Sequence, residues 1–227
     1  MIVTSVTSTG TVGPQPTGDR TVAGWPGLQR LEFSTTDPLR AREFLDQFYG
    51  WRLRVAGARD LRTALTVTHV DTGSFAVSDV ALPADLIFEV TGRDALIVST
   101  IIEGTARVDR AGGTDRYGPG DVLIGNFPLT RYVCHSHSFR CRNVVLPVSL
   151  LYAVGGLERH PSDPLRFLSP HPASPPARTQ WGNACDYAVS LLTDSEAPSP
   201  LLISIAARLL AATALTVFPN TATDGPG

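Results

Sequence analysis

Hydrophobic residues follow a helical period first and a strand period afterwards. Asp37-Pro38 is typical of a helix start, with Asp as the N-cap and Pro in the first turn, and Gly50 is expected to end the helix. Between them, apolar side chains recur at the spacing i, i+3, i+4 and i+7 of an amphipathic helix: Ala41, Phe44, Leu45 and Phe48. The pattern therefore predicts one helix over residues 37–50.

From Trp51 to Pro147 the pattern changes to short runs rich in β-branched residues, separated by turn signals such as Asp71-Thr72-Gly73 and Gly112-Gly113. It predicts about eight strands, about ten residues apart. They are Arg52–Val55, Ala64–Thr68, Leu86–Val90, Leu96–Ile102, Thr105–Asp109, Asp121–Gly125, Tyr132–His135 and Arg142–Leu146. Since no helix is expected between them, an antiparallel barrel or jelly roll is favoured over a parallel sheet.

After Pro147 the pattern is helical again. A short helical segment over 148–155 and a proline-rich linker over 161–176 come first. One helix then begins at Ser174-Pro175, and a last helix runs from Ser199-Pro200 to Pro219-Asn220. The first of these two helices has a single apolar stripe, formed by Trp181, Ala184, Cys185, Ala188, Leu191 and Leu192.

The last helix is apolar almost all the way round, so one partner helix cannot cover it. Its apolar sequence is interrupted only by Ser204, Arg208, Thr213 and Thr216. We expect a second copy of the chain to cover one side, which predicts a homodimer. The candidate contact residues are Leu202, Ile205, Ala206 and Leu209, while Leu201, Leu210 and Val217 point to other sides.

The charged residues argue against a membrane and against nucleic acid as partners. Leu201–Phe218 is long enough to cross a bilayer, but Arg208 lies in its middle, and a central Arg costs roughly 2.5–3.5 kcal/mol on insertion. We therefore predict a buried or interfacial helix of a soluble protein and no membrane contact. The net charge of −2 and the pI near 6.2 give no electrostatic attraction for nucleic acid. Met1–Gly10 lacks a signal-peptide pattern and the chain has three cysteines, an odd number, so a cytoplasmic location is expected.

Few residues form patterns typical of catalysis or metal binding. His135-Ser136-His137, flanked by Cys134 and Cys141, is the only cluster of potential transition-metal ligands. It lies where a turn between two strands is expected, and the cysteine spacing fits no zinc module, so no metal and no cofactor is predicted. The sequence contains no nucleophile elbow, phosphate-binding loop, dinucleotide turn or zincin helix. No catalytic residue is therefore predicted.

Two stretches that lie one hairpin apart resemble the cupin-type sensor domain of AraC-family transcriptional regulators: Ile101–Val108 and Tyr117–Leu123. The second contains the turn Gly118-Pro119-Gly120-Asp121, which re-enters an apolar strand at once. The flanks are similar as well. Phe33–Pro38 and the helix after it resemble the opening of the AraC-binding-like domain, and Pro200–Thr221 resembles its closing helix. The resemblance extends over nearly the whole chain, from about Gly27 to Asn220.

The resemblance implies a regulatory domain in which a barrel binds a small-molecule effector or serves as a scaffold, and helices form a dimer. In full-length members of the family, a C-terminal pair of helix-turn-helix motifs binds DNA. This chain contains no basic recognition-helix sequence. We therefore expect a domain that acts in regulation of transcription without binding DNA directly, and that reaches DNA only through a helix-turn-helix domain that it lacks.

The alternative is a small cupin-fold metal-dependent enzyme, an oxygenase or isomerase. Such enzymes carry His-x-His before the glycine of the first stretch, and a further His after the proline that follows the Pro-Gly-Asp turn. Ala95–Glu103 contains no His, and Arg131 stands about where the last ligand would be. The sequence therefore favours a regulator over an enzyme.

The predicted fold class is α+β: a cupin-like antiparallel β-barrel (double-stranded β-helix) with an N-terminal helix and a C-terminal helical dimerisation unit. The predicted divisions are a flexible N-terminal arm over 1–24, the sensor barrel with its leading helix over 25–149, the helical dimerisation region over 150–220 and the start of a linker or tail over 221–227. An early edge strand is the alternative for residues 1–24. An effector is expected in the barrel mouth, bound by strand residues with an aromatic ring or a hydroxyl: Trp51, Phe88, Thr100 and Tyr132. A shift of one residue in strand phase would turn each of them outward.

Overall fold

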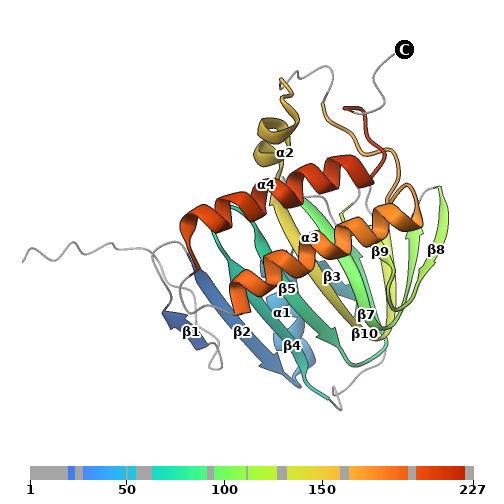
Figure 1. Ribbon diagram of the computed structural model, residues 1–227. Helices are drawn as coiled ribbons and strands as arrows, with labels where there is room; N and C mark the ends of the chain where they lie inside the picture. Colours follow the sequence, from blue (N-terminus) through green and yellow to red (C-terminus); the bar gives the residue numbers. More distant parts are fainter. Residues whose placement is uncertain are drawn as a thin grey trace, which may run out of the picture.

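The sheet is built around its two longest strands, β7 and β10. The computed structural model describes residues 20–23, 28–49, 51–54, 63–90, 95–110, 112–126, 132–158, 164–193 and 198–222, in which ten antiparallel strands form one curved sheet (Figure 1). They are β1 (Arg20–Ala23), β2 (Gln29–Thr35), β3 (Trp51–Arg54), β4 (Leu65–Asp71), β5 (Ala76–Leu82), β6 (Leu86–Val90), β7 (Ala95–Arg110), β8 (Gly113–Tyr117), β9 (Val122–Ile124) and β10 (Tyr132–Pro147). β7 and β10 contain 16 residues each and pair along most of their length.

Each long strand belongs to two halves of the sheet. The C-terminal half of β10 pairs with β5 and its N-terminal half with β6, while β7 pairs with β9 and then with β8. The halves meet at a bend, where the β7–β10 register shifts between His137 and Arg140. Gly104 (φ 71°) and Ser138 (φ 44°) lie there in the left-handed region. The sheet thereby folds over on itself, which confirms the predicted α+β class with an antiparallel barrel.

The predicted strands are wrong at this bend. Separate strands are predicted over 96–102 and 105–109, and over 132–135 and 142–146, but each pair is one continuous strand. The segment 136–138 is thus not a turn, because a bulge bends the backbone while pairing continues on both sides of it. β2, β5 and β8 are missing from the prediction, because their sequences mix Ser, Thr, Asp, Glu or Arg with the apolar residues.

The chain ends are described only in part. Within the predicted arm over 1–24, β1 is an edge strand that pairs with β2. The other residues of the arm, and residues 223–227 of the predicted tail, lie outside the described residues.

The sheet separates two hydrophobic cores. Along β10, Cys141 belongs to the core inside the barrel, whereas Val144 and Leu146 belong to the core on the outer face. This is the alternation that a strand imposes on successive side chains. β10 therefore contributes side chains to both cores, and so does β7, with Ile101 inside and Val98 outside.

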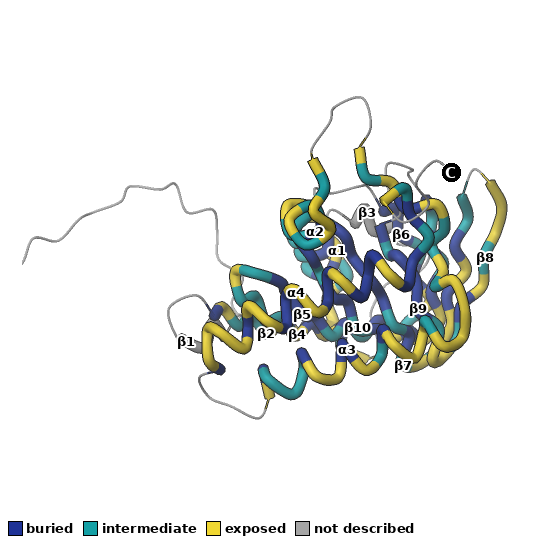
Figure 2. Tube along the Cα trace, turned by 45° about the horizontal axis from the view of Figure 1, so that its top comes forward, coloured by how far each residue is buried: buried dark blue, intermediate teal, exposed yellow. Residues whose placement is uncertain are grey.

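Helices cover both sides of the sheet. Those in the described part of the chain are α1 (Pro38–Tyr49), α2 (Val148–Gly155), α3 (Pro175–Thr193) and α4 (Pro200–Val217). α1 lies on the barrel side and buries Ala41, Leu45 and Tyr49 in the inner core. α3 and α4 lie across the outer face, buried toward the sheet and exposed on the far side (Figures 1 and 2).

Two helix starts are as predicted. The Asp37 carboxylate accepts a hydrogen bond from the Leu39 N–H at 2.8 Å, and the Ser174 hydroxyl accepts one from the Ala177 N–H at 3.3 Å. Both contacts satisfy N–H groups that lack a partner within the helix. The predicted helices over 37–50 and from Ser174-Pro175 are therefore confirmed at their first turns.

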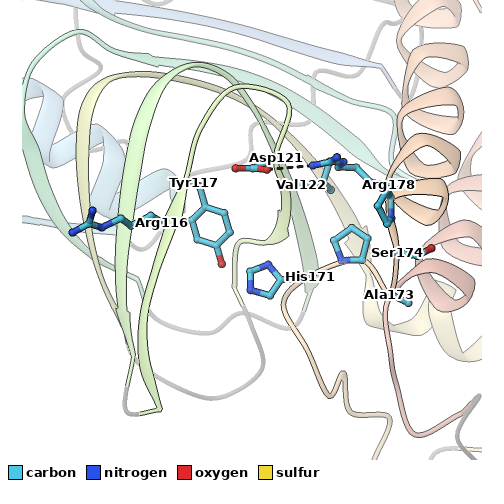
Figure 3. A pocket seen from close by; sticks show the side chains of 10 residues that line it. Arg116, Tyr117, Asp121, Val122, His171, Ala173, Ser174 and Arg178 are labelled. Atoms are coloured by element: carbon cyan, nitrogen blue, oxygen red, sulfur yellow. Dashed lines mark hydrogen bonds and ion pairs between the residues drawn. The ribbon is translucent and has the colours of Figure 1, made fainter.

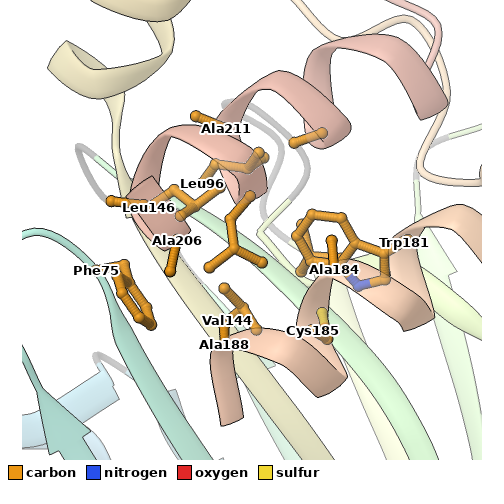
Figure 4. Packing of buried hydrophobic residues seen from close by; sticks show 14 of the residues in the cluster. Phe75, Leu96, Val144, Leu146, Trp181, Ala184, Cys185, Ala188, Ala206 and Ala211 are labelled. Carbon is orange, nitrogen blue, oxygen red and sulfur yellow. The ribbon is translucent and has the colours of Figure 1, made fainter. Parts of the chain in front are cut away.

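The outer core confirms the predicted stripe on α3. Trp181, Ala184, Cys185 and Ala188 are buried against Val144, Leu146 and Leu96 of the sheet and against Ala206 and Ala211 of α4 (Figure 4). Leu192 is also buried, and Leu191 packs at the edge of this core. Alanines on both helices allow α3 and α4 to approach each other and the sheet closely.

Among the described helices, α4 alone is long and apolar enough to span a membrane, with a mean hydropathy of 1.8. Half of this stretch is buried inside the protein. Its buried side includes Ala206, Leu210 and Ala214, which are fully enclosed by the outer core. α4 is thus a core helix of this fold, as the central Arg208 predicts.

Lowering the pH should weaken the contact between α1 and the barrel. His69 on β4 lies half-buried, with its Nδ1 2.7 Å from the Ser78 hydroxyl and its ring against Phe48 of α1. Burial lowers the pKa of His69, and Asp71 offsets this only in part. The unfolded chain therefore takes up the proton first, so stability should fall as pH decreases below about 6.5.

This prediction is tested by urea unfolding at about pH 7.5 and about pH 5.5. His69→Gln should reduce the loss of stability on acidification. His137→Gln, at an exposed position, should not reduce it. An equal pH dependence in the wild type and His69→Gln would contradict the prediction.

Candidate functional site

The barrel interior contains a small cavity of about 30 Å³. Strands of both halves of the sheet line it, mostly with apolar side chains: Phe88, Ile101, Val108, Leu123, Phe139 and Tyr132. A space of this size holds about one water molecule. A ligand larger than water must therefore displace lining side chains or widen the barrel.

One wall of the cavity is polar. Ser99 on β7 and Asn143 on β10 are direct cross-strand partners, and the Ser99 hydroxyl donates a hydrogen bond to Asn143 Oδ1 at 2.7 Å. Asn143 is fully buried, and its Nδ2 has no hydrogen-bond partner among the described residues. A buried amide without a partner costs about 1–3 kcal/mol. The cavity therefore offers a donor for a ligand oxygen or for a water.

Tyr132 joins the two halves of the sheet across the cavity. Its ring lines the cavity from β10, and its hydroxyl donates a hydrogen bond to the carbonyl of Gly125, in the turn after β9. Burial raises the pKa of Tyr132 far above its ordinary value, so the hydroxyl stays a neutral donor. Gly125 also packs against the polar wall of the cavity, because a Cβ there would lie 2.5 Å from the Ser99 hydroxyl oxygen.

A charged cluster borders the same end of the barrel. Arg110 on β7 donates from Nη1 to the Asp115 carboxylate and to the Tyr117 hydroxyl at 3.3 Å, and its Cζ lies 5.3 Å from the centre of the Tyr132 ring. Only 10% of the Arg110 side chain is exposed. Burial raises the pKa of Tyr117 to about 12, so Tyr117 is also neutral near pH 7.

A second and larger cavity, of about 360 Å³, lies between the barrel and the helical part (Figure 3). Tyr117 and Asp121 line it from the barrel, and His171 and Arg178 line it from the loop and first turn of α3. Arg178 pairs with Asp121 at 3.3 Å, and the rings of Tyr117 and His171 are 5.5 Å apart. Tyr117 thus contacts both the Arg110 cluster and the loop that leads into α3.

Two of the four predicted ligand-binding residues line the inner cavity, namely Phe88 and Tyr132. Thr100 does not: its neighbours Ser99 and Ile101 line the cavity, so Thr100 lies on the opposite face of β7. The prediction for Thr100 is therefore wrong, because the strand phase differs from the assumed one by one residue. Trp51 pairs with Val90 through the backbone of β3, and its side chain lies outside the described part of the structure.

Sequence reasoning misses Ser99, Asn143 and Arg110. Ser99 and Asn143 are polar residues within apolar strands, and Arg110 is the last residue of β7, so their positions are typical of the solvent face. The signal that could have found two of them is the pairing of Ser99 with Asn143, since two polar residues opposite each other on central strands must share one face. That signal depends on register, which the sequence alone does not provide.

The histidines and cysteines of the segment 134–141 lie in different environments and do not form one cluster. Cys134 and Cys141 line the cavity, where burial raises the pKa of Cys134 to about 12 and that of Cys141 even further. His135 pairs with Asp109 at 3.1 Å, and His137 pairs with Asp85. In the described ranges, no three His, Cys, Asp or Glu side chains lie close enough to hold a metal ion. That the protein binds no metal stays a prediction.

Three of the four candidate dimerisation residues are on the surface of α4. Leu202, Ile205 and Leu209 expose 38%, 46% and 39% of their area. Ala206 is wrong as a contact residue, because it is fully buried in the protein's own outer core. Leu210 and Val217 are likewise buried, so α3 and the sheet cover more of α4 than the sequence predicts.

The chain is similar to known proteins over most of its length. The model of the AraC-binding-like domain matches residues 41–216. Among solved structures, the AraC-like transcriptional activator CuxR superposes with a TM-score of 0.57 at 14% identity, over 83% of this chain and 71% of that one. No curated protein matches the chain by sequence.

Two further solved structures overlap with smaller parts of the chain. The Schizosaccharomyces pombe Cnp3 cupin domain covers 43% of this chain and 74% of its own, at 17% identity and a TM-score of 0.33. KdgF from Halomonas sp. covers 37% of this chain and 78% of its own, at 14% identity and the same TM-score of 0.33. The family model, in contrast, extends from α1 almost to the end of α4, and the protein therefore belongs to the AraC-binding-like domain family.

Proposed function

We propose that the chain is the effector-sensing and dimerising domain of an AraC-family transcriptional regulator, without catalytic activity of its own. Membership of the AraC-binding-like family supports a regulatory role. The observation that carries the sensing role is the inner cavity, which is apolar but contains the unpartnered Asn143 amide. Ligand sites combine these same features, an apolar wall and a few polar groups that fix orientation.

Sensing would work through the shape of the barrel. The described cavity is too small for a metabolite, so binding must favour a wider form of the barrel over the closed one. β7 and β10 carry inner-core and outer-core side chains on alternate positions, as with Asn143 inside and Val144 outside. A change in the inner lining therefore moves strands on which α3 and α4 pack, and α4 carries the proposed dimer surface.

DNA binding would require a separate helix-turn-helix domain. The chain has a net charge of −2 and no basic recognition-helix sequence. We propose that it controls DNA binding indirectly, by setting how two copies are held together. A cytoplasmic location fits this role.

A small-molecule screen followed by thermal denaturation tests the sensing role. The double variant Ser99→Ala/Asn143→Leu removes both partners of the buried hydrogen bond and leaves only the weakly donating Cys141 thiol without its acceptor. We expect hits from the screen to bind this variant at least about tenfold more weakly than the wild type.

Ala173→Leu is the matched control, since it narrows the larger outer cavity and leaves the barrel interior unchanged. Hits that Ala173→Leu weakens and the double variant does not would place the effector outside the barrel. That result would contradict the proposed site.

A further inference from the structure

Arg110 lies on the inner face of the barrel, and two of its three guanidinium nitrogens have no hydrogen-bond partner among the described residues. It follows Val108 by two residues, so both side chains are on the same face of β7, and Val108 lines the inner cavity. Nη1 is engaged by Asp115 and Tyr117. Nε and Nη2 are buried and have no hydrogen-bond partner among the described residues. Burying a charged donor in this way is costly unless a partner occupies the site at least part of the time.

The two free nitrogens form one edge of the guanidinium. Nε–H and Nη2–H point to the same side, and together they match the two oxygens of a carboxylate. Arg142 in this protein shows the match directly, because its Nε and Nη2 donate to the two Asp79 oxygens at 2.8 and 3.0 Å. Among the described residues, the same edge of Arg110 has no carboxylate opposite it.

The surroundings of Arg110 fit an acid with an apolar body. The guanidinium lies over the ring of Tyr132, which also lines the inner cavity. Asp115 neutralises Arg110 only in part, because 37% of the Asp115 side chain is exposed and its second oxygen lies 3.7 Å from His171. The free Nε/Nη2 edge of a single arginine matches a planar anion with one negative charge. A phosphate dianion would keep a second negative charge without a partner.

We propose that the effector is a small carboxylic acid, with its carboxylate bound by the Nε/Nη2 edge of Arg110 and its apolar body against Tyr132 in the barrel. This inference rests on the proposed sensing function, since it names the chemical class of the effector. Arg110 would then be the residue that distinguishes an acid from its neutral analogues. The acid would share Arg110 with Asp115 and Tyr117, both of which neighbour the His171 loop before α3.

The test compares acids with their own amides. Acetate, butyrate and benzoate are titrated into the wild-type protein beside acetamide, butyramide and benzamide, with binding followed by calorimetry and by thermal denaturation. We expect one or more acids to bind at least about tenfold more tightly than the matching amide, because a charge-assisted bidentate contact is lost in the amide. Arg110→Gln should weaken the acid by a similar factor and leave the amide unchanged.

Arg116→Gln provides the matched control. Arg116 is an exposed arginine on β8 and lines the outer cavity, so its loss removes the same charge nearby without touching the barrel interior. Acid binding that depends on Arg116 and not on Arg110 would assign the acid to the outer cavity and overturn the proposal. Arg110→Lys keeps the positive charge but lacks the two parallel N–H donors of the guanidinium, so it should also weaken acid binding. It serves as the second variant if Arg110→Gln folds poorly.

A measurement on the wild type avoids any folding defect. The Nε–H resonance of Arg110 in a nitrogen-15 spectrum should shift on titration with the acid that binds, and not with its amide. Amides that bind as tightly as acids, with no shift of this resonance, would overturn the carboxylate inference and leave the sensing function standing. A protein that binds no acid, no amide and no compound from the wider screen would overturn both.

Discussion

Gly104→Ala is expected to destabilise the fold by more than about 3 kcal/mol, a large part of the roughly 5–15 kcal/mol that a domain has. A Cβ at this position would lie 2.1 Å from the Ser138 carbonyl oxygen and 2.4 Å from that of His137. Both atoms are backbone, so no side chain can rotate away. The φ of 71° adds strain of about 1–2 kcal/mol for any residue with a Cβ.

The damage should extend beyond one strand. β7 and β10 approach each other at Gly104 and Ser138, and the two halves of the sheet fold together there. Pushing the strands apart opens the barrel between Ile101 and Ala106, which both belong to the inner core. Urea unfolding monitored by tryptophan fluorescence measures the loss.

Gly112→Ala is the control for this prediction. Gly112 lies in the turn between β7 and β8, and its φ is not positive. A Cβ at Gly112 would point into open space, with no described atom beyond its chain neighbours within 4 Å. The substitution should therefore change stability by less than about 0.5 kcal/mol. Equal effects of the two substitutions would show that the bend does not need glycine.

Features set by neighbouring residues could be predicted from the sequence. The caps at Asp37 and Ser174 are local, because each side chain bonds an N–H two or three residues away. The stripe on α3 is also local, since helical periodicity alone brings Trp181 and Ala188 to one face.

Features that depend on pairing could not be predicted. The continuity of β10 through Ser138 rests on its partner β7, and the sequence around Ser138 by itself is typical of a turn. Thr100 and Ser99 differ only in strand phase, which the register with β10 decides. Asn143 and Arg110 are polar residues whose burial results from the closure of the barrel, so sequence patterns assign them to the surface.

The burial of Ala206 has a similar origin. The apolar pattern of α4 shows that more than one surface covers the helix, but not which side faces which neighbour. The outer core takes Ala206, Leu210 and Ala214. The apolar surface of α4 left exposed for a partner is therefore narrower than the predicted dimer surface.

Leu209→Asp should convert the proposed dimer into monomers. Leu202, Ile205 and Leu209 are exposed, and the exposed Ala212 and Thr216 continue them at alternating spacings of three and four residues. This spacing is typical of a seam between two helices. Across a two-fold axis the substitution places two carboxylates in the apolar contact, so we expect the dissociation constant to rise at least about a hundredfold.

Ser204→Asp is the matched control, because Ser204 is exposed on α4 but lies outside the stripe. Sedimentation equilibrium should give a dimer for the wild type and for Ser204→Asp, and a monomer for Leu209→Asp with unchanged far-UV circular dichroism. The charge is the same in both variants, so only its position relative to the stripe can separate them. A wild-type monomer, or a dimer that survives Leu209→Asp, would show that this stripe does not join two copies. In that case the proposed control of DNA binding would require a route other than the distance between two copies.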